Sequence, residues 1–198
     1  CAYYSSAQKA VDNVPDYSPT KTPHLNRLRS PPSPGEVGAQ AVALRISGEQ
    51  AAFYNCGFYG AQDTLLDNRG KHYFKECFIQ GSIDFIFGNG RSLYERVVTI
   101  NSIAKQNGAI TTHASNSANE KTGFSFVRLL VDQEKYGLDD LGVTIVLAKT
   151  YISDVISSDG WNDPSKDSTV FFGEYECVDQ GQTTHFELLI VNNLIKMK

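Results

Sequence analysis

An internal repeat of about 21 residues constrains the fold of this chain more than any other sequence feature. Residues 52–64, AFYNCGFYGAQDT, align with residues 73–85, YFKECFIQGSIDF, so that Cys56 aligns with Cys77 and Asp63 with Asp84. A period in the twenties is typical of a solenoid, in which each unit packs against its neighbours. The unit holds short apolar and aromatic runs broken by turn residues, and helical repeats are longer. The sequence therefore predicts an all-β chain folded as a parallel β-helix.

The rest of the chain divides into three predicted parts. Short strands and turns alternate from Gln40 to about Ile110, and further strands are expected at 123–131, 143–153 and 169–177. These strands define a β-helix domain over 35–180. Residues 1–34 are predicted to form a degenerate N-terminal segment, with helical spacing at 6–14. A proline-rich linker begins within it at residue 23, and the proline-rich stretch continues to residue 38, into the start of the β-helix domain. The tail, 181–198, is either a short amphipathic helix or a frayed end.

Composition excludes several classes of function. The net charge is −4, and no basic run or basic helix face predicts a nucleic-acid partner. No apolar run approaches the ~18 residues of a membrane span, so no membrane partner is expected. Four cysteines are too few for a disulfide scaffold, and their spacing does not indicate zinc. Cys56 and Cys77 would stack in adjacent coils, where buried thiols are favoured over a disulfide, although both arrangements stay open.

The repeat itself predicts a pair of carboxylates. Equivalent residues of successive coils lie about 4.8 Å apart, so Asp63 and Asp84 would be neighbours on one face. Burial and mutual repulsion raise the pKa of one carboxyl in such a pair, which leaves one acid and one base or nucleophile. The amides of Gln40 and Gln62 lie on much the same face and could stabilise an oxyanion. The structural alternative is that the aspartates bind turn amides and the glutamines form a ladder.

Three motifs in order, QAVAL, QDTL and DFIFG, make the sequence resemble the plant pectin methylesterase (pectinesterase) family. They lie within GAQAVALRISGEQAAFYNCGFYGAQDTL and GKHYFKECFIQGSIDFIFGNGRSLYE, and DGWNDP followed by STVFFGEY extends the match. The match runs from about Gly35 to Phe126 and again from about Val143 to Cys177. This resemblance implies a right-handed parallel β-helix that hydrolyses the methyl esters of galacturonate units in pectin, without a metal or organic cofactor.

The resemblance also assigns roles to the polar residues. Asp84 of DFIFG resembles the nucleophile that attacks the ester carbonyl and forms an acyl-enzyme. Asp63 of QDTL resembles the acid that protonates departing methanol and then the base that activates water. Gln62 and Gln40 resemble the oxyanion donors, and Gln40 is also expected to contact substrate.

Phe87 and Trp161 fall where the family lines its sugar groove with aromatic side chains, although packing in the core is the alternative for both. The partners implied are methyl-esterified homogalacturonan and a proteinaceous pectinesterase inhibitor. The implied location is extracellular, in the plant cell wall, and no targeting segment is seen in the sequence.

Two departures from the family lead to a second hypothesis. Family members carry a Leu-Gly-Arg-x-Trp motif where this chain reads YGLDDLGVTIVLAKTY. One alignment places Gly137 and Asp139 at the arginine and tryptophan positions, another places Val143 at the arginine, and neither supplies the cation. The family's first strands are also replaced by proline-rich residues, which predicts a β-helix truncated at its N-terminal coils. The chain could therefore be a catalytically impaired or inactive relative. An inverting pectin glycosidase is a third alternative, but the sequence lacks the motifs of that class.

Overall fold

The computed structural model describes residues 28–29, 40–96, 99–102, 110–113, 120–132, 136–139, 144–152, 156–162, 171–179 and 182–183. The helix predicted at 6–14, most of the proline-rich linker and the tail beyond 183 lie outside the described residues. The three-part division of the chain stays a prediction. The described residues form strands, turns and bends but no helix, and hence no helix that could span a membrane.

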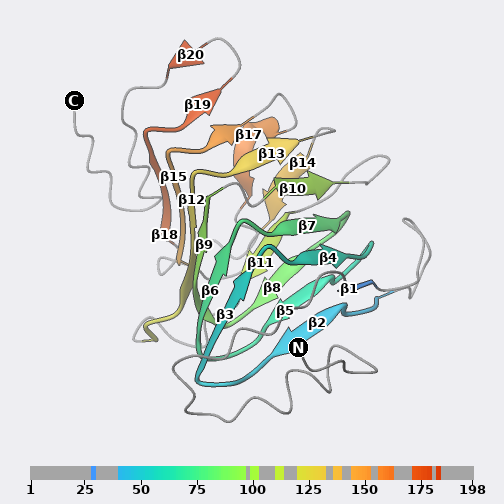
Figure 1. Ribbon diagram of the computed structural model, residues 1–198. Helices are drawn as coiled ribbons and strands as arrows, with labels where there is room; N and C mark the ends of the chain where they lie inside the picture. Colours follow the sequence, from blue (N-terminus) through green and yellow to red (C-terminus); the bar gives the residue numbers. More distant parts are fainter. Residues whose placement is uncertain are drawn as a thin grey trace.

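Stacked strands of three orientations build the fold (Figure 1). An eight-stranded sheet has the order β1 (Leu28–Arg29), β4 (Gly57–Tyr59), β7 (Phe78–Gly81), β10 (Thr99–Ser102), β13 (Leu130–Asp132), β16 (Tyr151–Ile152), β19 (Val178–Asp179) and β20 (Gln182–Thr183). A six-stranded sheet has the order β3 (Gln50–Tyr54), β6 (Lys71–Lys75), β9 (Arg91–Glu95), β12 (Gly123–Val127), β15 (Thr144–Ala148) and β18 (Phe171–Tyr175).

A four-stranded sheet completes the coils and carries the site described below. Its order is β2 (Leu44–Ile46), β5 (Leu65–Asp67), β8 (Ile86–Gly88) and β11 (Thr111–His113). Next to β11 lies β14 (Tyr136–Asp139), which pairs with β17 (Ile156–Asn162). Through most of the chain every third strand returns to the same sheet, and all pairs between named strands are parallel except β19 with β20. The predicted parallel β-helix is confirmed.

The core is a ladder of aromatic rings inside the six-stranded sheet. Phe53, Phe74, Tyr94 and Phe126 occupy one register on four successive strands, and all are at most 1% exposed. Their rings stack with centroids 5.0, 4.5 and 4.7 Å apart. Burying one such side chain stabilises the fold by about 1.5–3 kcal/mol. The 21-residue offset between Phe53 and Phe74 is thus the packing unit of the coil.

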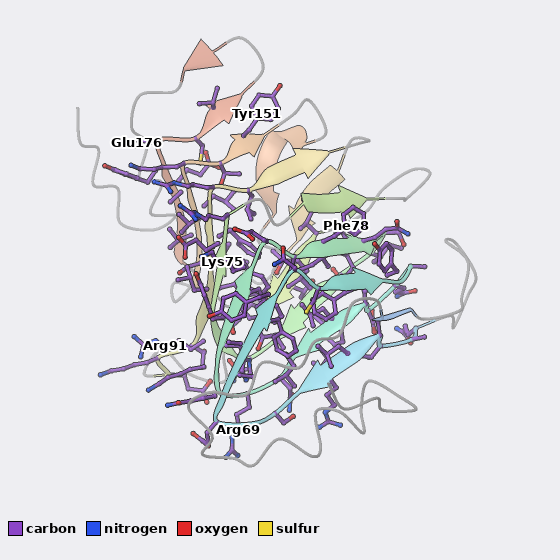
Figure 2. The ribbon with its side chains drawn as sticks, viewed as in Figure 1. Arg69, Lys75, Phe78, Arg91, Tyr151 and Glu176 are labelled. Carbon is purple, nitrogen blue, oxygen red and sulfur yellow. The ribbon has the colours of Figure 1, made fainter. Side chains whose placement is uncertain are left out.

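A tight turn follows each strand of the six-stranded sheet. Its first residue has a left-handed backbone, with φ between 48° and 58°, and none of these residues is glycine. This conformation costs a non-glycine residue roughly 1 kcal/mol or more, so the stacked coils must hold it in place. The set comprises Asn55, Glu76, Arg96, Arg128, Lys149 and Glu176. Figure 2 shows the interior side chains packed between the strands, whereas Arg69 and Arg91 extend away from the ribbon.

A hydrogen-bonded polar network lies inside the coils. Asp67 Oδ1 is 2.5 Å from His72 Nδ1, and the Tyr94 hydroxyl donates to Asp67 Oδ2 at 2.8 Å. The other ring nitrogen of His72 is 3.0 Å from the carbonyl of Gly48. All three side chains are buried, so the bonds replace the water they lost. Gly90 makes room for the network, because a Cβ there would lie 2.2 Å from Asp67 Oδ1.

The stacked cysteines are buried thiols. Cys56 and Cys77 occupy equivalent positions of adjacent coils, and both are buried thiols, as is Cys177. A hydrogen bond to Cys56 and burial both raise the pKa of the Cys77 thiol. Of the two arrangements left open by the sequence, the structure shows the thiol ladder.

Candidate active site

The two aspartates lie side by side where β5 and β8 begin. Isolated bridges pair Gln40 with Gln62 and Gln62 with Ile83, which extends the four-stranded sheet toward its N-terminal edge. Asp63 and Asp84 come directly after the paired residues Gln62 and Ile83. The Asp63 backbone N–H donates to the Ile83 carbonyl at 3.2 Å. Parallel neighbours are separated by about 4.8 Å. The predicted stacking of the aspartates in adjacent coils is confirmed.

An unusual backbone turns both carboxylates to the outer face. Asp63 has φ of 61° and Asp84 has φ of 46°, the left-handed region that non-glycine residues rarely adopt. The conformation breaks the alternation of the strand: Gln62 and Asp63 are both half-buried, and the next two residues, Thr64 and Leu65, are both fully buried. The same pattern recurs around Asp84. Strained backbone of this kind concentrates at functional sites.

The two carboxylates interact electrostatically. Burial raises the pKa of Asp63, and the negative charge of Asp84 raises it further. A raised pKa means that the neutral form of Asp63 is favoured beside an ionised neighbour. Asp63 is therefore the member of the pair that is inclined to hold a proton, which suits an acid beside a second carboxyl.

A threonine that the sequence analysis did not single out contacts the pair. The Thr112 hydroxyl donates to Asp84 Oδ1 at 2.5 Å. Thr112 lies on β11 in register with Phe87 of β8, so it belongs to the coil after Asp84. Ile86 pairs with Thr111 at a longer offset than the 21-residue repeat, which hid the relationship in the sequence. Aligning residues 111–113 with β8 as the next strand, and not by the fixed period, would have placed Thr112 beside Asp84.

Phe87 belongs to a row of residues on the outer face of the four-stranded sheet. Arg45, Leu66, Phe87 and Thr112 occupy one register on β2, β5, β8 and β11. Phe87 is half-buried and Arg45 is exposed, whereas the residues that precede them, Ile86 and Leu44, are fully buried. Phe87 therefore lies on the surface side of the sheet, beside the coil positions that carry the aspartates.

The structure describes the other predicted site residues in unequal detail. Gln40 is exposed and Gln62 is half-buried, and they pair with each other at the edge of the site. Trp161 lies on β17, paired with Leu138 of β14, so it is on the continuation of the stack beyond β11. Gly137 and Asp139 are on β14 itself, and Val143 lies outside the described residues. The sequence of β14, YGLD, contains no cation.

These features define a class: a parallel β-helix with a stacked carboxylate pair and two glutamines on the outer face of one sheet. The sequence model of the pectinesterase family matches residues 32–187. The chain belongs to the pectinesterase family.

Two relatives from Arabidopsis thaliana illustrate the match. "Probable pectinesterase 8" is 50% identical over 167 residues, which cover 76% of this chain and 42% of that protein. "Pectinesterase QRT1" is 46% identical over 156 residues, which cover 74% of this chain and 40% of that protein. The chain thus spans less than half the length of these curated relatives.

Solved structures share the fold. Pectin methylesterase from carrot superposes with a TM-score of 0.68 at 23% identity, over 80% of this chain and 55% of that one. Deglycosylated pectin methylesterase from Aspergillus niger gives a TM-score of 0.69 at 24% identity, over 86% of this chain and 59% of that one. At these identities the likeness establishes the parallel β-helix and no more.

Proposed function

We propose that this chain hydrolyses the methyl esters of galacturonate units in pectin, with Asp84 as nucleophile and Asp63 as acid and base. The observation that carries the proposal is the unlike surroundings of two neighbouring carboxyls. Asp84 accepts a hydrogen bond from the Thr112 hydroxyl, which holds one of its carboxylate oxygens. Burial and the charge of Asp84 raise the pKa of Asp63, which favours its protonated form. Membership of the pectinesterase family supports the choice of reaction.

The proposed reaction has two halves. A carboxylate oxygen of Asp84 attacks the ester carbonyl carbon, and the side-chain amides of Gln62 and Gln40 donate to the oxyanion that forms. The carbon–oxygen bond to the methoxy group breaks as Asp63 gives its proton, and methanol leaves. Asp63, now a carboxylate, takes a proton from water. The resulting hydroxide attacks the acyl-enzyme, which releases the galacturonic acid unit and restores ionised Asp84 and protonated Asp63. The product acid then loses its proton to solvent.

The substrate would lie along the outer row of the four-stranded sheet. Phe87 offers a half-buried ring next to the pair, and an apolar ring suits the face of a pyranose. One solved relative of the same fold is a pectin methylesterase in complex with a hexasaccharide, which supports an extended oligosaccharide as ligand. We assign Gln40 and Trp161 as further substrate contacts, and a proteinaceous pectinesterase inhibitor and a cell-wall location follow from the family.

A second candidate function is that of an inactive relative. It is favoured by β14, where the family arginine would fall, because the sequence YGLD supplies no cation there. An inverting glycosidase is disfavoured, since its carboxyls are separated by about 6.5–9.5 Å to admit water, whereas adjacent coils are closer.

Methanol release from highly esterified pectin tests the proposal. The purified chain should release methanol, and Asp84→Asn should abolish the release. Glu49→Gln is a suitable control, because Glu49 is an exposed carboxylate paired with Arg69. Activity that survives in Asp84→Asn would contradict the assigned nucleophile. No release from a chain whose circular dichroism is rich in β-structure would favour the inactive relative.

A further inference from the structure

The Thr112 hydroxyl makes a short bond to one carboxylate oxygen of Asp84. The Oγ1–Oδ1 distance is 2.5 Å, which lies in the range of hydrogen bonds between a hydroxyl and an ionised carboxylate. An ionised carboxylate can only accept, so the hydroxyl is the donor. The contact is half-buried, and competition from water is therefore reduced.

The backbone around this contact is well suited to hold Asp84 in one orientation. Thr112 is in the middle strand position of β11, which pairs in register with β8 over three residues. Asp84 lies two residues before β8, with its left-handed backbone conformation. Threonine is branched at Cβ, so its χ1 angle has few accessible values on a strand. A stiff donor on one coil thus contacts the carboxylate that lies just before the strand of the preceding coil.

The neighbouring groups explain why such a donor matters. Asp63, on the coil before Asp84, repels it electrostatically. On the other side of Thr112 comes β14, whose sequence YGLD supplies no cation that could orient the carboxylate. The hydroxyl of Thr112 on β11 is bonded to Asp84 on the side away from Asp63, and this bond limits rotation of the carboxylate.

We propose that Thr112 is a positioning residue for the nucleophile, and that its hydroxyl orients Asp84 for attack on the ester carbon. This inference rests on the proposed esterase function. With Oδ1 held by Thr112, the other oxygen, Oδ2, forms the bond to the ester carbon, and Oδ1 becomes the carbonyl oxygen of the acyl-enzyme. The hydrogen bond withdraws some charge from the nucleophile, which opposes the effect, but misplacement of a reacting atom by 1 Å can cost about a hundredfold in rate.

Substitution of Thr112 separates the hydroxyl from the shape of the side chain. Thr112→Val removes the donor and keeps the branched shape, whereas Thr112→Ser keeps the donor. We expect Thr112→Val to lower kcat for methanol release from esterified pectin about ten- to a hundredfold with little change in KM. Thr112→Ser should recover kcat to within about threefold of the parent.

The adjacent threonine provides a matched control. Thr111 is 2% exposed on the same strand, and its hydroxyl has no hydrogen-bond partner among the described residues. Thr111→Val should therefore leave kcat and KM unchanged. Thermal melting of all three variants checks that they fold.

The outcomes distinguish the two proposals. A kcat for Thr112→Val within about twofold of an active parent overturns the role of Thr112 alone. An equal loss in the valine and serine variants also overturns it, because the hydroxyl would then not be the cause. A folded parent that releases no methanol overturns the esterase function, and the role of Thr112 with it.

Discussion

Asp63 and Asp84 share a left-handed backbone, with φ of 61° and 46°, in adjacent coils of the solenoid. Because the two residues are in register, their strained conformations are stacked, and both carboxyls are turned outward at the same edge of the four-stranded sheet. A fold that needed only a turn here could use glycine or asparagine without the repulsion between two carboxylates. The arrangement therefore costs stability, and that cost gives the first prediction.

Asp63→Asn should abolish methanol release and stabilise the fold at neutral pH. Burial and the charge of Asp84 raise the pKa of Asp63, so the folded state binds more protons than the unfolded state once the pH exceeds the ordinary carboxyl pKa. The parent then loses stability as the pH rises through the raised pKa of Asp63, and the neutral amide removes that loss. Asparagine also tolerates the left-handed conformation.

Urea unfolding at pH 4 and pH 7 measures this effect. The free energy of unfolding of Asp63→Asn should exceed that of the parent at pH 7 by less than about 1 kcal/mol, since the side chain is partly exposed and solvent screens its charge. The difference should shrink at pH 4. A difference that is larger at pH 4 than at pH 7 would contradict the assigned direction of the pKa shift.

The two glutamines should contribute unequally to catalysis. Gln62 is half-buried and bridged on both sides, whereas Gln40 is exposed at the edge of the site. A buried oxyanion donor is worth about 10²–10³ in kcat, and water reduces the value of an exposed one. Gln62→Ala should therefore lower kcat by about that factor and Gln40→Ala by about tenfold or less. Steady-state kinetics of both variants on the same pectin measures the two losses. A loss of kcat in Gln40→Ala equal to or larger than that in Gln62→Ala would count against Gln62 as the main oxyanion donor.

Phe87 and Phe85 offer a test of the substrate role against packing in the core. Phe85 is fully buried, and Phe87 is half-buried on the outer row. Phe85→Ala should destabilise the protein by about 3–5 kcal/mol. Phe87→Ala should cost much less stability and should raise KM for pectin. If Phe87→Ala unfolds as readily as Phe85→Ala, with KM unchanged in the folded fraction, the assignment of Phe87 as a substrate contact is wrong.

The repeat predicted the parts of the site that share its period. Asp63, Asp84, Cys56 and Cys77 all follow one coil length, and the stacking of parallel strands brings equal positions together whatever the residues are. Phe87 likewise lies one coil length after Leu66, and both side chains are half-buried. Catalytic roles do not follow from spacing, and they remain proposals.

What the sequence did not predict depends on departures from the period and from alternation. Thr112 belongs to a longer coil, so a fixed offset does not bring it to Asp84. The left-handed conformation of Asp63 and Asp84 is held by bonds between coils, which no local propensity encodes. Asp67 was not singled out in the sequence, because its partners His72 and Tyr94 come from later strands of the stack.

The Asp67 network should stabilise the coils, and two tyrosines on neighbouring strands allow a matched test. Tyr94→Phe keeps the stacked ring but leaves buried Asp67 Oδ2 without its donor, which should cost about 1–3 kcal/mol. Tyr73→Phe removes the bond to Glu95 on the partly exposed outer face, and it should cost about 1 kcal/mol or less because water replaces the donor. Urea unfolding at pH 7 compares the two variants. A cost for Tyr94→Phe no greater than that for Tyr73→Phe would show that the ring ladder, and not the polar network, holds these coils together.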